Sequence, residues 1–124
     1  MALTKKYKTS IMERIQRDPD YTAALYAEAV SCLIEGDKAT ALSIIRDLVY
    51  AHITFKSLSK ETGVGEKALH RMLGSRGNPT TDNLCRIIHA VEKDLNLTTQ
   101  VTSKVIKCNR VAPKQEHKRE LAYA

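Results

Sequence analysis

Apolar side chains recur every three or four residues through most of the chain up to Leu97, which is the spacing of amphipathic helices. The broadest apolar face comprises Tyr21, Leu25, Ala29 and Leu33, with Tyr26, Val30 and Ile34 beside them. Asp18 is the predicted N-cap of this helix because Pro19 follows it, and a proline in the first helical position loses no hydrogen bond. Gly36 suits a left-handed C-cap. We therefore predict a helix between Asp18 and Gly36.

Similar apolar faces predict one helix before this segment and one after it. The preceding helix is short, is capped by Thr9 or Ser10, and ends before Asp18. Its apolar residues are Ile11, Met12 and Ile15. The following helix begins at Asp37. Its apolar face comprises Ala41, Leu42, Ile45, Leu48, Val49 and His52.

Capping residues and glycines divide the next part of the chain into three more helices. Their predicted N-terminal residues are Thr54, Gly65 and either Thr80 or Thr81, and the first two helices end at Thr62-Gly63 and at Gly74. Their inward residues are Phe55 and Leu58 in the first, Ala68, Leu69, Met72 and Leu73 in the second, and Leu84, Ile87, Ile88, Val91 and Leu95 in the third. The residues of 75–79 are typical of turns.

The fold class that follows from this pattern is all-α, a compact helical bundle, because no alternating strand pattern occurs before Leu97. Residues 98–106 are rich in β-branched side chains and are expected to form an edge strand or to pair with a partner. Residues 108–124 are polar and basic, as in flexible tails. We predict a basic N-terminal arm with a short helix at 1–19, a helical domain at 20–97, and a basic C-terminal extension at 98–124, flexible or ordered by a partner.

The charge of the chain points to a polyanionic partner, because 20 Lys and Arg residues face 14 Asp and Glu residues and leave a net charge of +6. Five basic and two acidic side chains lie in 1–19, and six and two in 98–124. Residues 20–54 hold two basic and five acidic side chains, and residues 55–97 hold seven basic and five acidic ones. Any DNA binding by the helical domain must therefore use a local patch, with the two ends adding salt-sensitive affinity.

Residues 55–74 have the pattern that two short, steeply crossing helices need. A small residue, Ser59, falls where the helices would touch, and Gly63 falls at the turn, where a left-handed backbone is required. Val64 is expected to plug the turn into the core. The apolar anchors are Leu58, Leu69 and Met72. The same spacing also fits an ordinary helical hairpin with glycine C-caps, and that alternative stays open here.

The spacing resembles the helix-turn-helix of the lambda repressor and Cro-like DNA-binding family. The resemblance implies that the helix beginning at Gly65 lies in the major groove of double-stranded DNA. Its outward side chains, Glu66, Lys67, His70 and Arg71, would then face base edges, with Lys67 and Arg71 the best donors to guanine or phosphate. Phosphate contacts are expected from Ser75, Arg76, Asn78 and Thr81, on the following loop and helix start.

Residues 10–97 also resemble the antidote proteins (antitoxins) of prophage-type addiction modules. The resemblance is carried by Glu61-Thr62-Gly63, Lys67-Ala68-Leu69 and Gly77-Asn78-Pro79-Thr80, with Tyr26, Glu35-Gly36-Asp37 and Ala41-Leu42 ahead of them. It implies a cytoplasmic homodimer that represses its own operon and binds a small RelE/ParE-like toxin. The chain extends past Leu97, where such proteins often stop. The alternatives are a stand-alone prophage regulator, or a toxin-masking module whose DNA binding is secondary.

No pattern in the chain favours enzymatic or metal chemistry. The histidines lack metal-ligand spacing, and no nucleophile motif or phosphate-binding glycine loop occurs, so we expect no catalytic residue, cofactor or metal. The cysteines are predicted to be reduced thiols, with Cys85 at least partly buried. Tyr26, Val30 and Ile34 form either an exposed strip for a dimer or toxin partner or part of the core, whereas Tyr21 is assigned to the core. No apolar run is long enough to span a bilayer, and we expect a soluble, cytoplasmic protein.

Overall fold

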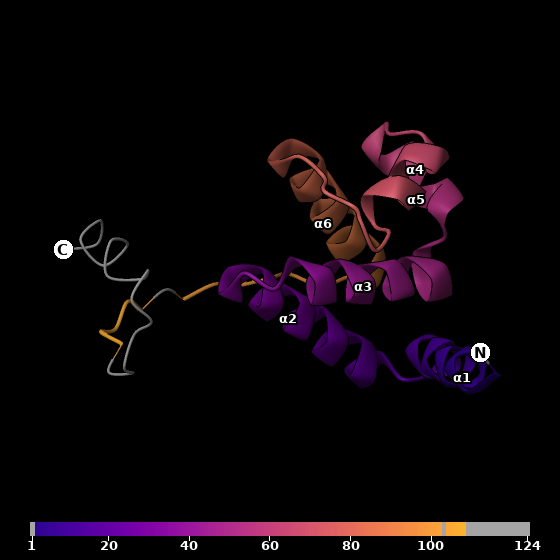
Figure 1. Ribbon diagram of the computed structural model, residues 1–124, viewed down its shortest axis with the longest axis horizontal. Helices are drawn as coiled ribbons and strands as arrows, with labels where there is room; N and C mark the ends of the chain where they lie inside the picture. Colours follow the sequence, from indigo (N-terminus) through magenta and orange to yellow (C-terminus); the bar gives the residue numbers. More distant parts are fainter. Residues whose placement is uncertain (1, 103, 109–124) are drawn as a thin grey trace.

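A computed structural model describes residues 2–102 and 104–108, and every regular element in those residues is helical (Figure 1). The helices are α1 (Ala2–Arg17), α2 (Pro19–Glu35), α3 (Lys38–Leu48), α4 (Phe55–Thr62), α5 (Glu66–Met72) and α6 (Thr81–Leu95), and a π-helical turn, η1 (Val49–Ile53), joins α3 to α4. The all-α prediction is thus confirmed for the described residues.

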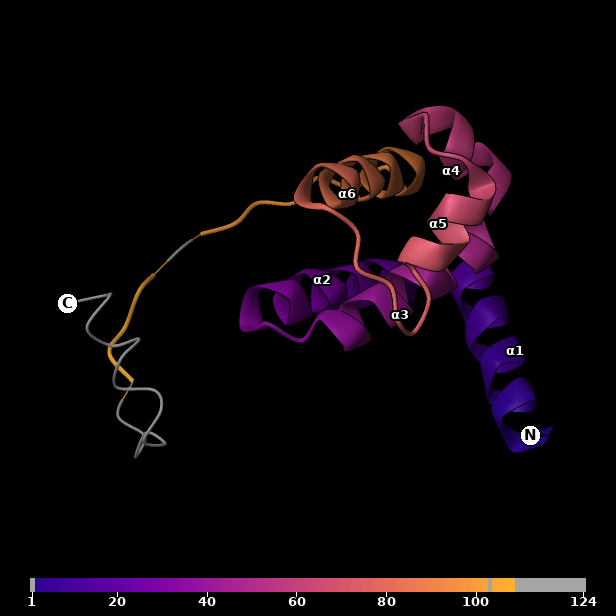
Figure 2. The ribbon, with the colours of Figure 1, turned by 45° about the horizontal axis from the view of Figure 1, so that its top comes forward.

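Helices α2 and α3 pack side by side, and α1 contacts both of them and η1 near one end (Figure 1). Helices α4, α5 and α6 lie together on the other side of α3, and the turned view keeps this separation (Figure 2). The core between these groups is almost entirely aliphatic. Its most deeply buried large side chains are Ile15, Ile45, Leu48, Val49, Leu58, Leu69, Leu73, Ile87 and Val91. Helix α5 packs mainly against α4.

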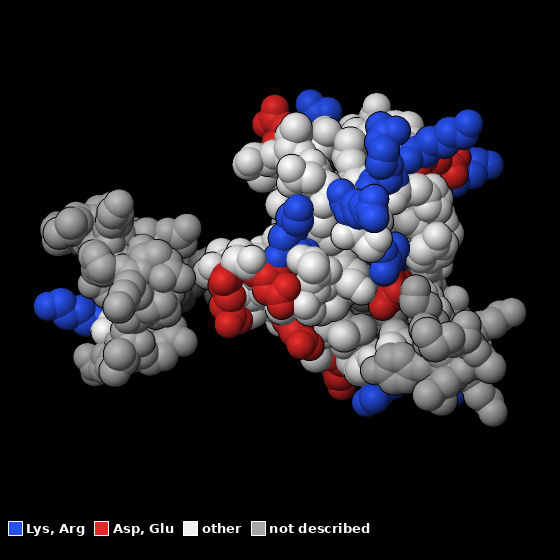
Figure 3. All heavy atoms as spheres, viewed as in Figure 1, with Lys and Arg blue, Asp and Glu red and all other residues white. Residues whose placement is uncertain are grey.

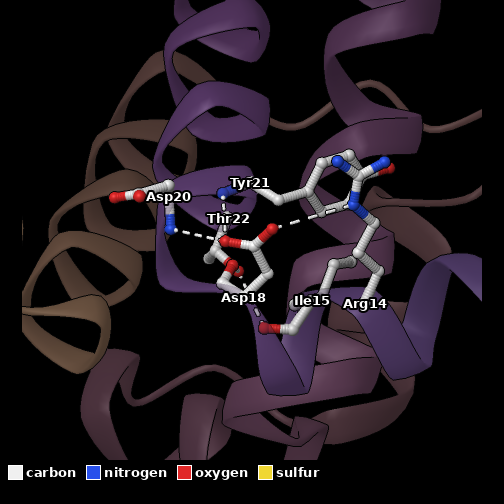
Figure 4. Close-up of polar contacts among 6 residues, drawn as sticks. All are labelled: Arg14, Ile15, Asp18, Asp20, Tyr21 and Thr22. Carbon is white, nitrogen blue, oxygen red and sulfur yellow. Dashed lines mark hydrogen bonds and ion pairs between the residues drawn. The ribbon is translucent and has the colours of Figure 1, made fainter.

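The corner between α1 and α2 follows the capping chemistry expected of Asp18 and Pro19. The Asp18 carboxylate accepts hydrogen bonds from the backbone N–H groups of Asp20 and Tyr21 at 3.1 and 3.2 Å (Figure 4). The Thr22 hydroxyl donates to the Ile15 carbonyl at 2.8 Å, and so ties the start of α2 to the end of α1. These contacts fix the direction in which α1 leaves the bundle.

The first helix is longer than predicted. Thr9 and Ser10 lie inside α1, which begins at Ala2, so neither residue is its N-cap. Serine and threonine are tolerated inside helices as well as favoured at caps, and residues 2–8 offer no breaker that would delay the helix. Ile15 at the other end of α1 is only 1% exposed, so this end belongs to the core.

The apolar strip proposed on α2 is divided between the core and the surface. Tyr26 is 4% exposed and belongs to the core, whereas Ile34 is 76% exposed. Val30 is half-buried and packs against the core, as does Tyr21. The prediction of an exposed strip is therefore wrong for Tyr26. Of the three residues, Ile34 alone is exposed.

Beyond α6 the chain is extended and forms no strand in residues 97–102 and 104–108. Thr99 holds the beginning of this segment to the bundle. Its backbone N–H donates to Glu92 Oε2 at 3.1 Å, and its hydroxyl donates to the same oxygen and lies 3.1 Å from the Tyr26 hydroxyl. The edge strand predicted for 98–106 is thus wrong within the described residues, and the tail predicted for 109–124 lies outside them.

The helices of the described residues include none that combines the length and the apolar character needed to cross a bilayer.

Candidate nucleic-acid interface

The turn between α4 and α5 is built by hydrogen bonds that are local in sequence. Gly63 closes α4 in the left-handed conformation, with φ of 76°, and donates its N–H to the Ser59 carbonyl at 2.9 Å. The Ser59 hydroxyl donates to the Val64 carbonyl at 2.6 Å, and the Val64 N–H donates to the Thr62 hydroxyl at 3.2 Å. Val64 itself packs against the core. The roles predicted for Gly63 and Val64 are confirmed.

Helix α5 buries one face and exposes the other, as its sequence predicts. Leu69 and Leu73 are fully buried, and Ala68 and Met72 are half-buried. Glu66, Lys67, His70 and Arg71 are all exposed. Lys67, His70 and Arg71 are three and four residues apart and lie along one side of the helix; we call them the α5 row.

The loop after α5 packs tightly under the end of that helix. Gly77 is buried, and a Cβ at this position would lie 1.9 Å from the Met72 carbonyl oxygen, so only glycine fits there. Arg46 of α3 donates from Nη1 to the Leu73 carbonyl at 3.1 Å and satisfies a carbonyl at the C-terminus of α5. Sequence reasoning missed this contact because it joins residues 27 positions apart.

The residues predicted to bind phosphate differ in their surroundings. Ser75, Arg76 and Thr81 are exposed without a side-chain partner among the described residues. The Asn78 Oδ1 accepts a hydrogen bond from Lys38 Nζ at 3.5 Å, so this side chain is engaged with the start of α3. Thr80 rather than Thr81 caps α6, since its hydroxyl accepts from the Asn83 N–H at 3.2 Å.

Basic side chains gather over α4 and α5, while acidic side chains lie mainly along α2 (Figure 3). Residues 55–78 hold five basic side chains, namely Lys56, Lys60, Lys67, Arg71 and Arg76, against two acidic ones, Glu61 and Glu66. Glu61 pairs with Lys93 of α6 at 3.4 Å. None of the five basic side chains forms an ion pair with any described residue. All five are free to bind an external anion.

An aromatic cluster that the sequence did not reveal supports one end of the α5 row. The His70 ring stacks on Phe55, with centroids 3.7 Å apart and an interplanar angle of 14°. Tyr50 of η1 meets Phe55 edge-on at 5.0 Å and lies 5.9 Å from His70. Phe55 is buried, whereas Tyr50 and His70 are exposed. The π-helical turn η1 brings Tyr50 to this position, and no local sequence pattern predicts this turn.

The backbone between η1 and α4 is strained. Thr54 has φ of 73° and ψ of 148°, a conformation that is essentially restricted to glycine, yet its hydroxyl accepts from the Ser57 N–H at 3.3 Å and caps α4. Such strain persists only where the surrounding packing fixes the backbone. The junction that carries the aromatic cluster is therefore held by its contacts.

Other candidate chemistry finds little support. Within residues 2–102 and 104–108, no group of three or more His, Cys, Asp or Glu side chains is placed to hold a metal ion. Cys85 is exposed on α6, so its predicted burial is wrong. The neighbouring stripe of α6 turns Leu84 and Ile88 toward the core and leaves Cys85 outside.

Comparison with models of protein families, with curated proteins and with solved structures finds no match for this chain.

Proposed function

We propose that the protein is a sequence-specific regulator that binds double-stranded DNA and represses its own operon. In this proposal α4 and α5 act as a helix-turn-helix, and α5 enters the major groove with the α5 row toward the base edges. Lys67 and Arg71 donate to guanine or to adjacent phosphates. Lys56, Lys60 and Arg76 contact the phosphate backbone on either side.

The observation that carries the proposal is the concentration of unpaired positive charge on a single rigid helical pair. The α5 row projects from a helix whose opposite face is buried through Leu69 and Leu73, so the row is presented in a fixed orientation. The surrounding basic side chains have no partners among the described residues. An ordinary helical hairpin in a bundle would also bury one face of its second helix, but it would need no cluster of unpaired basic side chains on the outward face.

A homodimer completes the proposal. Two copies related by a two-fold axis would place two α5 helices in successive major grooves, and the operator would be partly palindromic. A footprint on the DNA upstream of the protein's own reading frame, with two protected half-sites about one helical turn apart, is the expected result.

The double variant Lys67→Ala, Arg71→Ala tests the assignment of the α5 row. Both residues are exposed, so the fold and Tm are expected to be retained. Affinity for a duplex that the wild-type protein has enriched from a random pool is expected to fall at least about 30-fold, because each guanine contact contributes about 1–3 kcal/mol of discrimination. Fluorescence anisotropy on the enriched duplex and on an unrelated duplex measures the effect.

The matched control is Lys104→Ala, Lys107→Ala, which removes the same charge from the exposed segment after α6. This variant is expected to weaken binding to both duplexes alike and to leave their affinity ratio unchanged. The proposal fails if the random pool yields no enriched sequence. It also fails if the α5-row variant keeps the wild-type ratio while the control variant abolishes binding, since the protein would then bind through its basic ends.

A second candidate function is the masking of a small basic toxin, and it is favoured by the acidic side chains along α2 (Figure 3). Glu28, Glu35 and Asp37 are exposed, and we call them the acidic face. All three lie near the Cys32 thiol. Burial is the largest cause that raises the pKa of this thiol, and the three negative charges raise it further. Ile34 is 76% exposed among them. An apolar residue within an acidic surface fits a basic protein partner, and a module of this kind would be an antitoxin.

A further inference from the structure

The aromatic cluster beside the α5 row contains one polar group that the fold does not use. Tyr50 is 52% exposed, and no described residue forms a hydrogen bond with its hydroxyl. Its ring is nevertheless held, because it packs edge-on against the buried ring of Phe55. A tyrosine with an anchored ring and a free hydroxyl is typical of a binding surface, since the ring loses little conformational entropy when the hydroxyl is bound.

The position of Tyr50 places this hydroxyl beside the proposed DNA-binding helix. His70, a member of the α5 row, lies 5.9 Å from Tyr50 between ring centroids. Arg71 is the next residue on α5, and Lys67 lies one turn earlier on the same side. Tyr50 also lies close to the start of α4, where Thr54 caps the helix and Lys56 is exposed. It therefore borders the α5 row on the side of α4.

We propose that Tyr50 contacts the DNA backbone, with its hydroxyl donating a hydrogen bond to a phosphate oxygen when α5 occupies the major groove. This inference rests on the proposed DNA-binding function and extends the interface from the α4–α5 pair to η1. Tyrosine hydroxyls are common donors to phosphate, and such contacts position a protein on the duplex without reading its sequence. Phe55 and His70 serve as positioning residues for the Tyr50 ring.

Within the α5 row, the same geometry makes His70 less suited to contacting bases than Lys67 or Arg71. Its ring lies flat on Phe55 at 3.7 Å, so it is turned toward the start of α4 rather than standing out from α5. The strained backbone of Thr54 lies between Tyr50 and Phe55 in the chain and fixes their relative placement. The phosphate contact thus follows from the long-range packing of η1 against α4 and α5.

The variant Tyr50→Phe tests the inference, because it keeps the ring and removes only the hydroxyl. We expect its affinity to be about 3- to 10-fold weaker than that of the wild type, which is the effect of one lost hydrogen bond. The loss should be equal on the enriched duplex and on an unrelated duplex. The slope of log affinity against log salt should not change, because no charge is removed. Tm should stay at the wild-type value. Tyr21→Phe, which removes a hydroxyl at the corner of α1 and α2, is the matched control and should bind as the wild type does.

Each other outcome overturns the inference in a distinguishable way. Wild-type affinity of Tyr50→Phe on both duplexes shows that the hydroxyl makes no contact. A loss on the enriched duplex alone assigns Tyr50 to base recognition instead. A loss accompanied by a lower Tm assigns the hydroxyl to the stability of the fold. If the wild-type protein binds neither duplex, the proposed function fails and this inference fails with it.

Discussion

Tyr26 joins three parts of the chain that are far apart in sequence. The residue lies on α2, is 4% exposed, and its hydroxyl lies 3.1 Å from that of Thr99, which in turn donates to Glu92 of α6. Burial is the largest cause that raises the pKa of Tyr26 from 10.0 to about 12. The hydrogen bonds from Thr99 hold the pKa of Glu92 below its ordinary value. The buried phenol is thus stable only in its neutral form.

This environment predicts a specific loss of stability in alkali. Below pH 10 the phenol is protonated in both the folded and the unfolded chain, so its full contribution to the free energy of unfolding is present there. Between pH 10 and about 12 the unfolded chain ionises first, and the folded state loses up to about 2–3 kcal/mol. Tyr26→Phe is expected to cost about 1 kcal/mol at neutral pH, for the contact with Thr99, but to show a smaller alkaline loss. Urea unfolding at a series of pH values measures both effects.

Tyr21→Phe is the control for this prediction, because it removes a different phenol and leaves Tyr26 in place. It should keep the full alkaline loss of the wild type. If Tyr26→Phe and the wild type lose the same stability between pH 10 and 12, the buried phenol is not the cause.

Single residues were predictable from the sequence where one helical face is plainly apolar, and less so elsewhere. Leu69 and Leu73 were placed correctly because the other face of α5 is charged. Helix α2 has apolar side chains on most of its surface, so periodicity could not decide whether Tyr26 or its neighbours face inward. The hydroxyl of Tyr26 contacts Thr99, which is 73 positions away.

Helix termini were the most predictable elements, because their hydrogen bonds are local. The predicted N-caps on Asp18 and Thr54, the helix start at Asp37 and the left-handed glycine at 36 are confirmed, and of the two candidates Thr80 and Thr81 the first is the cap. The cap predicted on Thr9 or Ser10 is wrong, because no breaker delays the start of α1. The π-helical turn η1 was not predicted, since its register is set by contacts with α1, α4 and α6. The aromatic cluster was missed for the same reason. The sequence therefore predicted the outward residues of the α5 row, but not the aromatic cluster that packs beside them.

The end of α5 depends on the close approach of Gly77 to the backbone of that helix. A Cβ at residue 77 would lie 1.9 Å from the Met72 carbonyl oxygen and 2.9 Å from that of Arg71, and neither backbone atom can move alone. Gly77→Ala is expected to lower the free energy of unfolding by about 3 kcal/mol, at the upper end for overpacked sites. Thermal or urea unfolding measures the change.

Gly65→Ser is the matched control, because a Cβ at Gly65 meets nothing within 4 Å and serine is a favoured N-cap. Its stability should equal or slightly exceed that of the wild type. An equally small effect of Gly77→Ala would mean that the loop after α5 is not packed against Met72 as described.

The two proposed activities use different surfaces of the molecule. The α5 row lies with the basic side chains over α4 and α5, and the acidic face runs along the second half of α2 to the start of α3 (Figure 3). The sequence predicted the bundle and the opposite charges of the segments 20–54 and 55–97. It could not predict that these segments would present their charges on different parts of the surface, because that separation follows from how α2 and α3 pack beneath α4 to α6 (Figures 1 and 2).

This separation predicts that toxin masking and DNA binding can be removed independently. Glu28→Lys, Glu35→Lys reverses two exposed charges of the acidic face and leaves the N-cap Asp37 intact. If the acidic face receives a basic toxin, the variant should fail to restore growth when co-expressed with the product of the adjacent reading frame, and should not co-purify with it. Its DNA affinity should remain at or above that of the wild type, since negative charge has been removed.

Lys67→Ala, Arg71→Ala should behave in the opposite way, masking the toxin while binding DNA poorly. A charge-reversed variant that still masks the toxin would place the protein contact elsewhere, and a wild-type protein that masks nothing would leave the chain as a DNA-binding regulator alone.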